Sequence, residues 1–144
     1  MVVIGIVAGC GDGAPPAAND SVVHEVGGRR IVLNIARTRA SKNQLFTVTI
    51  DSGAEPIALN RIATWTVRVQ DAQGRAVENA RIGVEGGMPE HNHGLPTAPR
   101  VTADLGGGDY RLEGVKFQMP GWWVVKLHIT AYGASDTVTF NLML

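Results

Sequence analysis

Hydrophobic and polar residues alternate along most of the chain from residue 29 onward. The clearest case is residues 63–70, where Ala63, Trp65, Val67 and Val69 alternate with polar or charged residues. Such a period of two places apolar side chains on one face of a strand and polar side chains on the other. Similar rows, separated by turn residues, begin at Ile31, Phe46, Ala80, Val101, Tyr110, Trp123 and Val138. No window of about 11 residues or more carries a helical stripe, so the pattern predicts strands throughout.

The number and spacing of these rows predict an architecture. About seven to eight short strands with intervening turns, such as Asp71-Ala72-Gln73-Gly74, are typical of an antiparallel β-sandwich. We therefore predict an all-β, immunoglobulin-like domain over residues 29–144. Trp65 and Trp123 are expected in its core, and Trp122 and His128 on the outward side of their strand.

Composition agrees with a small globular domain. A chain of 144 residues suits one hydrophobic core, and 44% hydrophobic with 18% charged residues is not a disordered composition. The 13 basic and 13 acidic residues balance, and no basic block occurs, so we expect no nucleic-acid partner. The single cysteine excludes an internal disulfide and any site built on several cysteines.

The first residues are predicted to be an export signal. Residues 1–9 would be a lipoprotein signal peptide, because Val7-Ala8-Gly9-Cys10 has the small residues of a lipobox before the cysteine. Cys10 would then carry the lipid that anchors the chain to a membrane, and residues 10–28 would be a flexible tether. A start codon assigned too late would explain the short apolar segment and the missing Lys or Arg before it. The alternative is a buried strand with Cys10 as an inert core thiol.

Two segments between predicted strands carry methionine and histidine. Residues 88–96 read Met-Pro-Glu-His-Asn-His-Gly-Leu-Pro, and residues 117–123 read Phe-Gln-Met-Pro-Gly-Trp-Trp. Each antiparallel strand reverses the chain, and counting these reversals places both segments at one end of the sandwich. Loops at the rim of a rigid β scaffold commonly carry binding sites. The candidate metal ligands on this rim are Met88, His91, His93 and Met119.

The chemistry of these side chains favours copper. Thioether sulfur prefers a soft ion and imidazole tolerates one, so the set suits copper and especially Cu(I). Glu90 is a weaker candidate, for Cu(II), and Trp122 would limit the access of solvent to the site. The alternative is that Met88 and Met119 fill the end of the core while the histidines are solvated loop residues.

The same two segments, together with residues 66–74 and 110–114, resemble the YtkA-like/FixH-like group of bacterial envelope proteins. The resemblance covers roughly residues 60–142, and Met-Pro-x-His-x-His-Gly-Leu-Pro and Met-Pro-Gly-Trp-Trp are its distinctive pieces. It implies an immunoglobulin-like sandwich outside the cytoplasm and a role in copper handling or delivery. It also implies that the partner is a copper transporter, an efflux component or an oxidase-assembly protein.

These observations lead to one functional expectation and one alternative. We expect a lipoprotein of the bacterial cell envelope, periplasmic or on the outer surface, that binds copper and is not an enzyme. The chain contains no H-E-x-x-H, no G-x-S-x-G and no phosphate-cradling glycine loop. The alternative is an envelope interaction or assembly module that binds no metal.

Overall fold

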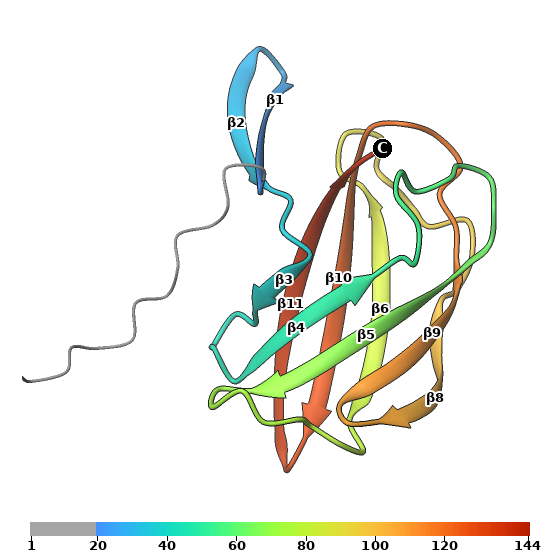
Figure 1. The fold of residues 1–144 in the computed structure, drawn as a ribbon. Coiled ribbons are helices and arrows are strands. Elements are labelled where there is room, and N and C mark those ends of the chain that lie inside the picture. Colours follow the sequence, from blue (N-terminus) through green and yellow to red (C-terminus); the bar gives the residue numbers. More distant parts are fainter. Residues whose placement is uncertain (1–19) are drawn as a thin grey trace, which may run out of the picture.

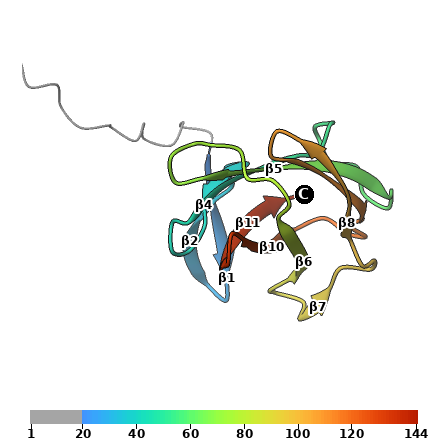
Figure 2. The ribbon, with the colours of Figure 1, turned by 90° about the horizontal axis from the view of Figure 1, so that it is seen from below.

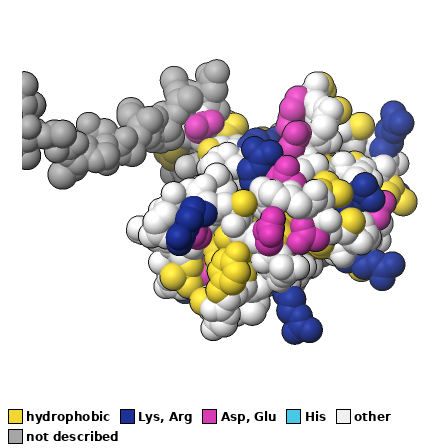
Figure 3. Space-filling model, turned by 60° about the horizontal axis from the view of Figure 1, so that its bottom comes forward, with side chains coloured by type: hydrophobic (Ala, Val, Ile, Leu, Met, Phe, Trp, Pro, Cys, Tyr) yellow, Lys and Arg dark blue, Asp and Glu magenta, His cyan; other side chains and the backbone are white. Residues whose placement is uncertain are grey.

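The computed structural model describes residues 20–144. The predicted signal peptide, the lipidated Cys10 and the first part of the tether therefore lie outside the described residues. Within residues 20–144 every regular element is a β-strand, and no helix in this range could cross a membrane. Basic and acidic side chains are interspersed over the face shown in Figure 3, as the balanced composition suggests.

Two sheets of antiparallel strands pack face to face (Figures 1 and 2), which confirms the predicted immunoglobulin-like β-sandwich. The five-stranded sheet has the order β3 (Thr38–Ala40), β4 (Phe46–Asp51), β5 (Ala63–Asp71), β9 (Asp109–Val115), β8 (Arg100–Gly106). The four-stranded sheet has the order β11 (Ala134–Met143), β10 (Trp122–Ala131), β6 (Arg81–Met88), β7 (His93–Gly94). Residues 20–144 contain three strands more than the eight predicted rows: β3 and β7 are too short to show a period in the sequence, and the third, residues 21–26, lies in the predicted tether.

The core lies between the two sheets and is filled by the apolar rows. On β5, Trp65, Val67 and Val69 are at most 2% exposed, while the intervening side chains lie nearer to solvent. Trp123 on β10 is fully buried and His128 on the same strand is exposed, as predicted. Trp122 is partly buried and points to the opposite side from Trp123, because successive residues of a strand alternate between its faces.

The end of the predicted tether differs from expectation. Residues 21–26 form strand β1 (Ser21–Val26), which pairs with β2 (Arg29–Asn34) in a separate hairpin at one end of the sandwich (Figure 1). Gly27 and Gly28 turn the chain with positive φ angles of 55° and 76°, which suit a tight hairpin turn and favour glycine. The side-chain amide of Asn141 on β11 donates a hydrogen bond of 3.0 Å to the carbonyl of Asn34. The predicted boundary at residue 29 therefore falls inside this hairpin.

Candidate metal centre

The two Met- and His-bearing loops lie at the same end of the sandwich, as strand counting predicted (Figure 1). The first connects β6 to β7, and the second comprises residues 116–121 between β9 and β10. A side chain added to Gly121 would place its Cβ 2.8 Å from the terminal methyl of Met88, so Met88 rests against the backbone of the second loop. The N–H of Gly121 donates to the carbonyl of Leu144 at 2.7 Å, and the reverse bond is 3.0 Å. The end of the chain thus fixes the second loop beside the first.

The first loop is a tight turn that brings two imidazole rings together. The backbone N–H groups of His91 and Asn92 donate to the carbonyl of Met88 at 3.2 Å and 3.0 Å. Asn92 has a φ of 49°, a left-handed conformation that asparagine tolerates better than most residues. The rings of His91 and His93 are stacked with their centroids 5.8 Å apart.

The ring of His93 is oriented by a hydrogen bond. Its Nδ1 lies 3.0 Å from the carbonyl oxygen of Gly94. Since a carbonyl only accepts, Nδ1 carries the proton in this bond, and in neutral imidazole Nε2 then has a free lone pair. Metal-binding histidines commonly have this arrangement, in which one ring nitrogen donates to a carbonyl and the other coordinates.

Trp123 connects the two loops through the core. Its ring meets the ring of His93 edge to face, with centroids 5.6 Å apart, and its indole N–H donates to the carbonyl of Met119 at 3.0 Å. The ring of Phe117 lies 5.1 Å from Trp123 on the core side. The sequence pattern assigned solvent shielding to Trp122, but the tryptophan in contact with the candidate ligands is Trp123.

Trp122 and Glu90 instead face the N-terminal hairpin. The imidazole of His24 lies 2.9 Å from the carboxylate of Glu90 and 5.8 Å, centroid to centroid, from the ring of Trp122. Glu90, the weaker candidate ligand, is thus occupied by a contact with β1. Sequence reasoning gave His24 no role, although the partly buried positions Val22, His24 and Val26 alternate along β1. This alternation is one of burial, and the sequence does not show it, because the intervening Val23 is apolar and yet exposed.

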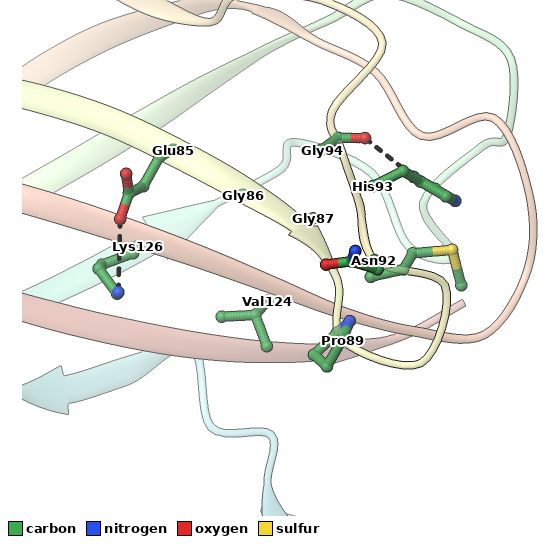
Figure 4. A pocket seen from close by; sticks show the side chains of 10 residues that line it. Glu85, Gly86, Gly87, Pro89, Asn92, His93, Gly94, Val124 and Lys126 are labelled. Atoms are coloured by element: carbon green, nitrogen blue, oxygen red, sulfur yellow. Dashed lines mark hydrogen bonds and ion pairs between the residues drawn. The ribbon is translucent and has the colours of Figure 1, made fainter.

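A hollow of about 430 Å³ lies beside the first loop on the four-stranded sheet. Figure 4 shows His93 at one end of this hollow and the ion pair of Glu85 and Lys126, 3.4 Å long, at the other. Met88 also lines it, whereas His91 and Met119 do not. Met88 is 2% exposed and Met119 is partly buried, so both thioethers lie in mainly apolar surroundings.

The donor types at this end of the molecule restrict which metals fit. Within residues 20–144, no group of three or more His, Cys, Asp or Glu side chains is placed to hold a metal ion. A zinc site of the usual kind needs such a group. A metal held here would instead use two imidazoles and two thioethers, a set that matches the softness of Cu(I).

Comparisons with known proteins identify the family. The chain is similar to a DUF4426 family protein from Pseudomonas aeruginosa PAO1, with 14% identity over 87% of this chain and 94% of that chain and a TM-score of 0.49. It is also similar to the ZirS C-terminal domain, with 13% identity over 100% of this chain and 95% of that chain and a TM-score of 0.43. A search of curated proteins found no match. The sequence model of the YtkA-like family matches residues 40–128, a range that includes both candidate loops, and the chain therefore belongs to the YtkA-like family.

Proposed function

We propose that this protein binds one copper ion, preferentially Cu(I), and acts in copper handling or delivery outside the cytoplasm. The ligands would be Met88, His91, His93 and Met119. The observation that supports the proposal is the meeting of the two loops around Trp123, which contacts the ring of His93 and holds the carbonyl of Met119.

The surroundings of these side chains suit a soft, monovalent ion. His93 already has its Nδ1 directed at a carbonyl, which leaves Nε2 for the metal. Met88 and Met119 offer sulfur from positions packed against the core, where few oxygen ligands compete. Cu(II) prefers nitrogen and oxygen in tetragonal geometry, so two thioethers favour Cu(I) over it.

The exposure of His91 gives a route for transfer. This side chain is exposed and lies in the turn, whereas Met88 is buried behind it. A partner could therefore replace the outer imidazole first, and the inner thioethers last. A copper transporter, an efflux component or an oxidase-assembly protein is the class of partner that this role requires.

A Cu(I) competition titration tests the site. The double variant His91→Ala/His93→Ala should lose more than about 100-fold in affinity for Cu(I), since even residues that only orient a ligand are worth about 10–100-fold. Met119→Leu keeps the apolar volume but removes the sulfur, so it should weaken Cu(I) binding more than Cu(II) binding. Affinity should also fall in acid, because imidazole must be neutral to coordinate a metal.

His128→Ala is the matched control, because it removes an exposed imidazole on the outer face of β10. It should change neither affinity nor stoichiometry. If the double histidine variant binds Cu(I) as tightly as the parent, the site is wrong. This end of the sandwich would then be better explained as the contact surface of a metal-free interaction module.

We also propose that the chain is a lipoprotein anchored through Cys10, on the lipobox character of residues 7–10. Full-length protein expressed in a bacterium should then fractionate with membranes. Cys10→Ser should release it into the soluble fraction or leave an unprocessed precursor, which immunoblotting of the fractions would show. Equal membrane association of variant and parent would exclude the lipid anchor.

A further inference from the structure

A second hollow, of about 400 Å³, lies between β3 and the outer face of the four-stranded sheet; it shares Lys126 with the first hollow and is lined by none of the candidate copper ligands. Its polar lining consists of basic side chains, one imidazole and two hydroxyls, and none of its lining residues carries a carboxylate. These residues are Arg39, Lys42, Lys126, His128, Thr137 and Thr139.

The strand register explains one wall of this hollow. Leu127 on β10 is fully buried, so its neighbours Lys126 and His128 point outward. Lys126 lies opposite Thr139, and His128 lies opposite Thr137, in the pairing of β10 with β11. Side chains opposite each other in an antiparallel pair lie about 5 Å apart, so these four form one continuous polar surface.

The other wall comes from β3 and the residues that follow it. The backbone N–H of Lys42 donates to the carbonyl of Thr137 at 2.8 Å, which joins this segment to the edge of β11. Arg39 lies opposite the fully buried Val48, so its side chain points to the inner side of the five-stranded sheet. Because β3 is the edge strand, the guanidinium reaches out of the sandwich toward β11.

The charge in the hollow is balanced on one side only. Glu85 on β6 lies 3.4 Å from Lys126 and 3.2 Å from His128, and hydrogen bonds from His128 and then Lys126 lower the pKa of Glu85. Among residues 20–144, Arg39 and Lys42 form no ion pair with a carboxylate. The β3 side therefore presents two cationic groups outside any ion pair, while the carboxylate of Asp136 in the same region is buried and accepts hydrogen bonds from Ser41, Asn43 and Thr137.

We propose that this hollow binds a phosphate group, either as a free phosphate or as the headgroup of an anionic lipid. The guanidinium of Arg39 can donate two parallel hydrogen bonds to phosphate oxygens, and Lys42 adds a compact positive charge. The hydroxyl of Thr139 supplies a further donor on the opposite wall, while the hydroxyl of Thr137 lies 3.3 Å from Nδ1 of His128. This site is separate from the copper ligands and does not depend on them.

A simpler explanation predicts a different result. An inward-pointing charge on an edge strand discourages pairing with another sheet, and Arg39 on β3 fits that description. If Arg39 serves only this purpose, no anion is needed at this position, and the protein should show no saturable binding of phosphate.

The experiment uses the full chain carrying Cys10→Ser, so that no attached lipid contributes to membrane binding. Inorganic phosphate is titrated at constant ionic strength, with chloride as the balancing ion, and backbone amide shifts are followed by NMR. In a parallel arm, sedimentation measures binding to phosphatidylcholine vesicles with and without phosphatidylglycerol. The test variant is Arg39→Gln/Lys42→Gln. Its control is Arg100→Gln/Lys116→Gln, which removes the same two positive charges outside the hollow, one on β8 and one directly after β9.

We expect saturable shifts at the amides of β10 and β11 around the hollow, and at least about a 10-fold loss of affinity in Arg39→Gln/Lys42→Gln only. Saturation by inorganic phosphate identifies free phosphate as a sufficient ligand. Binding only to vesicles that contain phosphatidylglycerol, lost in the same variant, identifies the lipid headgroup. Lack of binding in both arms, or equal losses in the two double variants, would overturn the proposal. Lys42→Gln alone, at an exposed position, repeats the test if the double variant is unfolded.

Discussion

Trp65→Ala is expected to lower the free energy of unfolding by about 3–5 kcal/mol, because it removes a large aromatic ring from a well-packed core. The ring is 2% exposed and lies on β5, which pairs with both β4 and β9 at the centre of its sheet. Its centroid is 5.9 Å from that of Phe117, so the deletion also removes one of the two aromatic rings that pack against this neighbour, the other being Trp123. Urea denaturation of parent and variant, followed by circular dichroism, measures the loss.

Trp65→Phe is the matched control for this substitution. The indole Nε1 of Trp65 is buried and has no hydrogen-bond partner within the described part of the chain. Phenylalanine therefore keeps an aromatic ring at this position and removes no hydrogen bond. Trp65→Phe should lower the free energy of unfolding clearly less than Trp65→Ala does. If both variants lose the same free energy of unfolding, or if Trp65→Ala loses less than about 1 kcal/mol, the ring does not have the proposed packing role.

The core and the candidate metal centre are connected by aromatic contacts. Trp65 contacts Phe117, Phe117 contacts Trp123, and Trp123 contacts the ring of His93, with centroid distances of 5.9, 5.1 and 5.6 Å. The imidazole is thus supported from behind by a row of buried rings. A rigid support of this kind holds a ligand in place more precisely than a loop alone.

The fold was predictable because its strands are long enough to show a period. On β5 and β10 the alternation identifies the buried residues directly, and the buried Trp65 and Trp123 agree with it. The two-residue β7 carries no such signal, because a period needs several residues to show itself. Only the first strand of the N-terminal hairpin, β1, falls in the predicted tether, because it follows a stretch rich in Gly, Pro and Ala, whereas β2 falls in the predicted domain.

The candidate site was predictable only in part. Counting strands is enough to place the two loops at one end of the sandwich, because this placement depends only on the direction in which each strand runs. Which tryptophan contacts His93 depends on the local path of the second loop, and here strand alternation directs Trp123 inward to it. The contact of His24 with Glu90 joins residues 66 positions apart, which no local pattern encodes. Long-range side-chain contacts of this kind require coordinates.

Asp136→Asn is the second substitution with a large expected effect, a loss of about 2–4 kcal/mol at neutral pH. Asp136 is 6% exposed, and its carboxylate fastens the connection between β3 and β4 to β11. It accepts hydrogen bonds from the hydroxyl of Ser41 at 2.6 Å and from the backbone N–H of Asn43 at 2.9 Å and of Thr137 at 2.8 Å. Asparagine would present an amide N–H₂ to these donors and lacks the charge that strengthens the bonds.

The pH dependence of this loss separates the charge from simple packing. Burial on its own raises the pKa of Asp136, but the hydrogen bonds from Ser41 and from the backbone of Thr137, Asn43 and Leu45 outweigh it and lower the pKa to about 2. The ordinary value is 3.8, so the unfolded chain takes up the proton first as the pH falls. The stabilisation is therefore complete above about pH 4 and is lost as the pH falls toward 2.

Parent and Asp136→Asn should consequently differ most at neutral pH and converge as the pH approaches 2. Thermal or urea unfolding across this range measures the difference. Asp51→Asn is the control, because Asp51 is exposed and accepts one hydrogen bond, from the N–H of Gly53 at 2.8 Å, so its substitution should change stability little at any pH. A difference between parent and Asp136→Asn that stays constant from neutral pH to pH 2 would mean that the carboxylate charge contributes nothing. The loss would then come from replacing the carboxyl group by an amide, and a neutral carboxylic acid would accept these hydrogen bonds as well as the carboxylate does.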